Sequence, residues 1–108
     1  MPLTRSFNDL IKSRVAADPA FRQALFQEAV QTMLDGDVAT ARSVLRDTIN
    51  ATIGFERLAQ GTGTPPKSLM RMFGRQGNPT AEHLLGVISV LQRQTGVRLE
   101  VTAVADAA

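Results

Sequence analysis

The segment from Phe55 to Leu85 constrains the fold of this chain more than any other. Two short amphipathic stretches are joined by a turn that contains Gly61 and Gly63, and a loop and a third amphipathic stretch follow. This order is typical of a helix-turn-helix, in which two short helices meet at a tight turn.

Proline residues set the start of the second stretch. A residue that precedes a proline is disfavoured in the helical region, so Thr64 and Pro65 are both expected to be non-helical. Pro66 is then the first residue of a helix that ends near Phe73. Pro65 has no side-chain acceptor at the cap position, which leaves the exposed amides of this helix to water or to a phosphate.

Capping residues and apolar periodicity predict five further helices. Helix starts are predicted at Ser6, Asp18, Asp37 and Thr80, and a compact helix is predicted from Glu56 to Gln60. Residues 97–102 alternate apolar and polar side chains, which predicts one short strand. A lone strand needs a partner for its backbone groups, and the same strand of a second copy is the simplest one.

These patterns predict an all-α fold, with a helix-turn-helix domain, an N-terminal helical extension and a short C-terminal strand. The expected divisions are residues 1–36 for the extension, 37–102 for the helix-turn-helix domain and 103–108 for a flexible tail. At 108 residues the chain has the length of one domain and a modest core, which is consistent with a homodimer.

Composition narrows the class of protein. The chain has no cysteine, which excludes disulfides and thiol catalysis and fits a reducing cytoplasm. We expect no membrane span, because no run of about 18 apolar residues occurs. We also expect no secretory signal, because the first residues lack an apolar core.

The positive charge is concentrated in the second half of the chain. Residues 1–57 carry 7 basic and 7 acidic side chains, whereas residues 58–98 carry 5 basic side chains and Glu82 alone. A local excess of this sign is what phosphate binding requires. The alternative interpretation is a solvated face whose asymmetry arose by chance.

No group of residues predicts catalysis. His83 is the only histidine and has no second ligand at metal-binding spacing, so we interpret it as a structural or surface side chain. The Gly61–Gly63 fragment lacks the lysine and the preceding strand of a phosphate loop. We therefore expect no enzyme activity, no catalytic residue, no bound metal and no cofactor.

The helix that begins at Pro66 has the chemistry of a DNA-reading helix. Its apolar residues fall on one face and would dock on the domain, and long donors fall opposite. Arg71 can donate two hydrogen bonds to guanine, and Lys67 can reach a base edge or a phosphate. Ser68 is small enough to let the helix enter the major groove.

Residues beside this helix are placed for contacts with the DNA backbone. The helix starts at Pro66 and Thr80 present amides toward phosphates. Arg75, Gln76 and Asn78 lie on the loop between them. The alternative interpretation is an all-helical scaffold on which Lys67 and Arg71 only solvate a surface.

The segment LAQGTGTPPKSLMRMFGRQGNPTAEHLLGVISVLQRQTGVRLEV resembles the Xre-type, lambda-repressor-like helix-turn-helix of bacterial addiction-module antidote proteins, the HigA-like antitoxins. The resemblance covers roughly residues 40–101. It is carried by the residues Leu58, Ala59, Gly63, Ser68, Leu69, Gly77, Asn78, Pro79, Thr80, Leu84, Leu85, Gly96, Val97, Arg98 and Leu99.

The resemblance implies two groups of DNA-binding residues. One group faces the DNA from the recognition helix and comprises Pro66, Lys67, Ser68 and Arg71. The other contacts the backbone beside it and comprises Arg75, Gln76, Asn78 and Thr80. Family members usually place a hydroxyl and a polar residue where this chain has Pro65 and Pro66, so base recognition here falls more heavily on Lys67 and Arg71.

The sequence thus predicts a cytoplasmic, sequence-specific transcriptional regulator that binds a double-stranded DNA operator as a homodimer and represses its own operon. The resemblance implies an antitoxin of a toxin–antitoxin pair, with residues 5–36 covering a cognate toxin. The alternative function is a protein-interaction module without DNA binding, in which Phe21, Phe26 and Phe55 form a docking surface, although phenylalanines usually fill a core.

Overall fold

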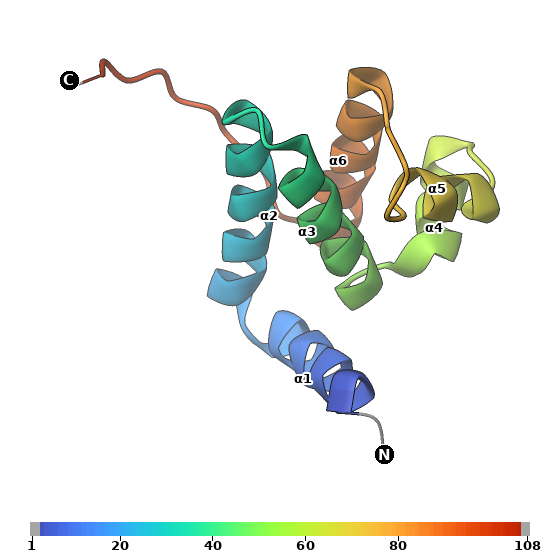
Figure 1. Cartoon of the computed structure of the whole chain (residues 1–108). Coiled ribbons are helices and arrows are strands. Elements are labelled where there is room, and N and C mark those ends of the chain that lie inside the picture. Colours follow the sequence, from blue (N-terminus) through green and yellow to red (C-terminus); the bar gives the residue numbers. More distant parts are fainter. Residues whose placement is uncertain (1–2, 107–108) are drawn as a thin grey trace.

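The computed structural model describes residues 3–106, and the side chains of residues 9–106. This part of the chain is all-α, as the sequence predicts, and holds six helices (Figure 1). In chain order they are α1 (Leu3–Ala17), α2 (Pro19–Leu34), α3 (Val38–Ala51), α4 (Gly54–Thr62), α5 (Pro66–Met72) and α6 (Ala81–Thr95). None of these helices is long and apolar enough to cross a membrane.

Two aspartates start α2 and α3 as predicted. The Asp18 carboxylate accepts hydrogen bonds from the backbone amides of Ala20 (3.0 Å) and Phe21 (3.3 Å). The Asp37 carboxylate accepts one from the Thr40 amide at 3.2 Å. Hydrogen bonds from the Thr40 side chain and amide hold the pKa of Asp37 below its ordinary value of 3.8. Each cap satisfies amides that a helix start otherwise leaves unpaired.

The N-terminal helix is longer than predicted. The predicted cap at Ser6 is wrong, because α1 already begins at Leu3; the Ser6 side chain itself lies outside the described side chains. Figure 1 shows α1 below the rest of the molecule, at the start of α2. Two contacts join these helices: the Arg14 guanidinium lies 5.0 Å from the centre of the Phe21 ring, and Arg22 donates a hydrogen bond to the Val15 carbonyl at 2.8 Å.

The core lies where α2, α3, α4, α5 and α6 meet. Phe26 and Leu45 bring the faces of α2 and α3 into it, and Leu91 does the same for α6. All three side chains are at most 1% exposed. One continuous cluster therefore spans the predicted division at residue 36, and its buried members are Phe26, Ala29, Leu45, Ile49, Phe55, Leu58, Leu69, Phe73, Leu84, Val87, Ile88, Val90, Leu91 and Val97.

The predicted strand at residues 97–102 is absent from the structure. This segment has no regular secondary structure. Figure 1 shows the chain passing behind α2 and α3 after the end of α6, and only the C-terminal end running away from the body. The physical reason is that no other strand occurs in residues 3–106 to pair with it. Alternation of side chains predicts an extended backbone, but a strand also requires a neighbour that accepts and donates its hydrogen bonds.

Candidate nucleic-acid interface

The turn between α4 and α5 is shorter than predicted, because α4 runs from Gly54 to Thr62 rather than from Glu56 to Gln60 and so includes Gly61. Gly63 ends α4 in the left-handed region at φ +76°, and its amide donates to the Ala59 carbonyl at 2.9 Å. That backbone conformation favours glycine. Pro65 precedes α5 without a side-chain cap, and Pro66 is the first helical residue, as predicted. Three residues thus separate two helices of which the second is only seven residues long.

Two buried side chains fix the orientation of α5. Leu69 is 1% exposed, and Phe73, which caps the end of the helix, is 0% exposed. The Phe73 ring lies 6.4 Å from the Phe55 ring of α4, with the two planes tilted by 54°. Such tilted aromatic pairs stabilise a core beyond their burial alone. With this face buried, the opposite face of α5 is directed to solvent.

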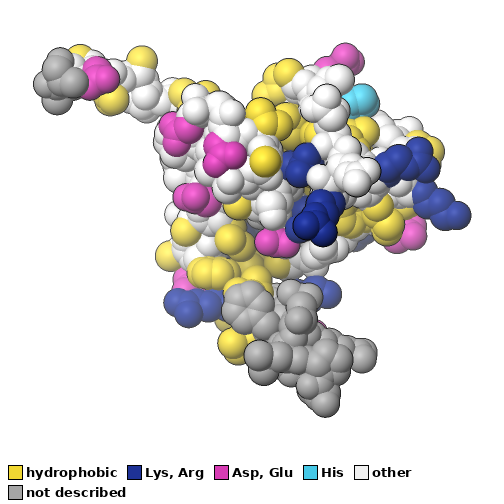
Figure 2. Space-filling view, in the orientation of Figure 1, with side chains coloured by type: hydrophobic (Ala, Val, Ile, Leu, Met, Phe, Trp, Pro, Cys, Tyr) yellow, Lys and Arg dark blue, Asp and Glu magenta, His cyan; other side chains and the backbone are white. Residues whose placement is uncertain are grey.

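The exposed face of α5 carries two cations without partners. Lys67 and Arg71 are both exposed and stand four residues apart, so they lie on one face of the helix. Neither makes a hydrogen bond or an ion pair with the described part of the chain. Met70 is 50% exposed beside them, while Pro66 and Ser68 are half-buried. Figure 2 shows Lys and Arg side chains gathered over α5 and the loop beside it.

The loop from Gly74 to Pro79 holds the predicted backbone-contacting residues. Arg75, Gln76 and Asn78 are all exposed. Their loop packs closely against the end of α5. The evidence is that a β-carbon on Gly77 would lie only 2.0 Å from the Met72 carbonyl oxygen. The loop therefore has a defined position relative to α5.

Arg42 of α3 holds this loop in place, a role that the sequence did not reveal. Its guanidinium donates to the Gly77 carbonyl at 2.5 Å and to the Arg75 carbonyl at 3.1 Å. A planar guanidinium is suited to bridging two acceptors in this way. The partners lie 35 and 33 residues further along the chain, so no local pattern predicts the contact.

Thr80 caps α6 as predicted, and its hydroxyl is already engaged. Its oxygen accepts a hydrogen bond from the His83 amide at 3.2 Å and lies 2.8 Å from His83 Nδ1. A hydroxyl has one proton to donate. While that proton is donated to the His83 ring it is not available to a phosphate, so any contact from this position falls to the backbone at the start of α6.

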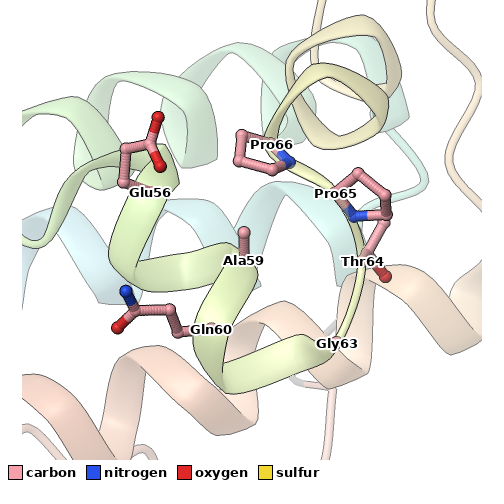
Figure 3. A pocket seen from close by; sticks show the side chains of 7 residues that line it. All are labelled: Glu56, Ala59, Gln60, Gly63, Thr64, Pro65 and Pro66. Atoms are coloured by element: carbon pink, nitrogen blue, oxygen red, sulfur yellow. The ribbon is translucent and has the colours of Figure 1, made fainter.

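An open hollow of about 450 Å³ lies between α4 and the start of α5 (Figure 3). Of the predicted DNA-binding residues, only Pro66 lines it. Glu56 is the one ionisable side chain among its lining residues, and its negative charge disfavours a phosphate there. The described residues also hold no group of three His, Cys, Asp or Glu side chains that could bind a metal ion. The remaining residues of the lining are Ala59, Gln60, Gly63, Thr64 and Pro65.

The alternative function would require Phe21, Phe26 and Phe55 to form an exposed docking surface, and the structure does not expose them together. Phe26 is 1% exposed and Phe55 is 8% exposed, so both belong to the core, and Phe21 is half-buried beneath Arg14.

Comparison of the chain with protein-family models, with curated proteins and with solved structures finds no match in any of the three.

Proposed function

We propose that this protein is a sequence-specific DNA-binding transcriptional regulator that acts as a homodimer on a two-fold symmetric operator. One observation carries the proposal: α5 is packed by Leu69 and Phe73 on one side and exposes the unpaired cations Lys67 and Arg71 on the other. Exposed donors on a helix of fixed orientation are what recognition in the major groove requires.

The parts of this surface have different tasks. Arg71 reads a guanine through two hydrogen bonds, and Lys67 binds a base edge or a phosphate. Pro66 and Ser68 let the helix backbone approach the groove. Arg75, Gln76, Asn78 and the start of α6 at Thr80 contact the sugar–phosphate backbone and so fix the register of the protein on the duplex.

The resemblance to addiction-module antidote proteins supports a narrower role. In that role the protein represses its own operon and neutralises a toxin encoded beside it. Residues 5–36, which include α2 and most of α1, would cover the toxin. A small ribonuclease-like protein in the neighbouring open reading frame, which co-purifies with this chain when the two are expressed together, is the result expected for an antitoxin.

Binding across a salt series tests the DNA-binding role. Duplexes selected from a random pool by the wild-type protein are titrated with Lys67→Ala, Arg71→Ala and the control Arg93→Ala, which removes an exposed cation from α6. Arg71→Ala should lose roughly 1–3 kcal/mol on the selected site and relax its specificity. If Lys67 binds a phosphate, Lys67→Ala should weaken all sequences alike and lower the salt slope by about 1.

Two outcomes would contradict the proposal. If both α5 variants keep the full affinity of the wild type at fixed salt, α5 is not the recognition helix. If the wild-type protein binds no duplex even at low salt, the DNA-binding role itself is wrong.

A further inference from the structure

The C-terminal segment from Val97 to Val101 leaves one backbone edge open. The Val97 amide donates to the Thr95 hydroxyl at 3.4 Å, and the Leu99 amide donates to the Gln92 side chain at 2.8 Å. The amides that alternate with these, on Arg98 and Glu100, have no hydrogen bond within the described part of the chain. In an extended backbone, alternate residues direct their amide and carbonyl groups to opposite edges. One edge is therefore held by the chain itself and the other is free.

The side chains of this segment also differ between its two faces. Val97 is 8% exposed and Leu99 packs against the core cluster, whereas Arg98 and Glu100 are exposed. Val101 continues the apolar face but is 72% exposed, because the chain has by then passed beyond the core. A neighbouring strand along the free edge would accept hydrogen bonds from the Arg98 and Glu100 amides and would shield the Val101 side chain from solvent.

We infer that the occupant of this edge is the same segment of a second copy, paired antiparallel about a two-fold axis at Leu99. In that register Arg98 of each copy lies directly opposite Glu100 of the other, and Val97 lies opposite Val101. Opposite charges at directly opposed positions stabilise a strand pair, and like charges destabilise it. The inference specifies the homodimer interface of the proposed function and depends on that homodimer, but not on DNA.

The alternative registers along this edge are less favourable. An axis at Arg98 would place two arginines opposite each other, and an axis at Glu100 would do the same with two glutamates. Pairing about Leu99 is also consistent with the hydrogen bond that this residue makes to Gln92. At that axis the two Leu99 residues form a pair whose backbone groups point away from the partner strand, and the Arg98–Glu100 pairs exchange the inter-strand bonds.

Sedimentation of the full chain without DNA tests the interface and its register. The wild type should be a dimer at micromolar concentration. Arg98→Glu and Glu100→Arg each create two like-charge oppositions, so each should raise the dimer dissociation constant roughly tenfold or more. The double variant Arg98→Glu with Glu100→Arg should restore the dimer, and Arg93→Glu, which changes the charge equally on α6, should leave it unchanged.

Cysteine cross-linking provides a second measurement. The natural chain has no cysteine. Leu99→Cys should form a disulfide-linked dimer on mild oxidation, since the two positions meet at the axis within disulfide reach. Thr102→Cys should not, because its two copies would be about 20 Å apart. Circular dichroism of each variant should show unchanged helix content, since the segment lies outside the helices.

The outcomes separate this inference from the proposed function. Charge reversals that leave the dimer intact, or a double variant that does not restore it, would overturn the interface or its register. A wild-type monomer would overturn the inference together with the homodimer. Binding of selected duplexes by that monomer, still sensitive to Arg71→Ala, would show that recognition through α5 stands on its own.

Discussion

Gly77→Ala tests whether the loop that carries the predicted backbone contacts is locked against α5. A β-carbon at this position would lie 2.0 Å from the Met72 carbonyl oxygen and 2.5 Å from the Arg71 carbonyl oxygen. Both atoms belong to the backbone at the end of α5, so no side-chain rotation can relieve the contact. To reach even a 3.0 Å separation, the loop and the helix end must move apart by about 1 Å.

The size of the effect follows from this displacement. Forcing an extra carbon into a packed site costs about 1–3 kcal/mol, and the upper part of that range applies where backbone must move. For a domain of about this size, each kcal/mol lowers Tm by roughly 4–8 °C. We therefore expect Gly77→Ala to lower Tm by about 10 °C. The same shift disturbs the spacing between α5 and the loop, so DNA affinity should fall beyond the loss of folded protein.

Gly86→Ala is the matched control, because it adds the same carbon atom but is expected to change Tm in the opposite direction. Gly86 lies inside α6, and nothing lies within 4 Å of a β-carbon built there. Alanine in an exposed helix interior is about 0.5–1 kcal/mol more favourable than glycine. We expect this variant to raise Tm by a few degrees and to leave DNA affinity unchanged.

Thermal unfolding followed by circular dichroism at the helix band measures both variants. If Gly77→Ala unfolds at the wild-type temperature, the close approach of the loop to the α5 carbonyls does not exist in solution. If both substitutions lower Tm equally, the contrast between a crowded and an open glycine is refuted as well.

Three further predictions concern the groups that hold this framework together. Thr80→Ala removes the cap of α6 and should lower the free energy of unfolding by about 0.5–2 kcal/mol in urea titrations, whereas Thr80→Ser should lose little of it. Because the pKa of Asp37 in the folded chain lies below 3.8, its contribution to stability is present above that pH and is lost as the pH falls through the folded value. Asp37→Asn should therefore reduce the difference between urea midpoints measured at about pH 6 and about pH 3, and an unchanged difference would contradict the assignment. Arg42→Ala removes both hydrogen bonds to the loop and should lower DNA affinity without lowering the salt slope. A lower salt slope for this variant would instead indicate that Arg42 binds a phosphate.

Local signals in the sequence predicted the starts of α2, α3, α5 and α6, whereas α1 and α4 begin earlier than the predicted Ser6 and Glu56. Asp18, Asp37 and Thr80 cap the helices that they were expected to cap, and Pro66 begins α5. These predictions succeed because a cap or a proline acts on amides only two or three residues away. The face of α5 was predictable for the same reason, since helical periodicity alone separates Leu69 from Lys67.

The other failures concern signals that depend on distant partners. The alternation in residues 97–102 predicted a strand, which is wrong for a chain in which the described residues offer no partner strand. Arg42 was missed because its two acceptors are brought to it only by the packing of α3 against the loop.

If α5 is the recognition helix, its shortness links gene control to protein lifetime. Seven residues are too few for a helix to persist by itself in water, so this one exists only while Leu69 and Phe73 are seated in the core. In a nicked, heated or partly unfolded molecule, α5 is therefore lost altogether rather than weakened. If α5 reads the operator, promoter occupancy will follow the fraction of intact molecules, and a protease that shortens their half-life will switch transcription on without any inducer.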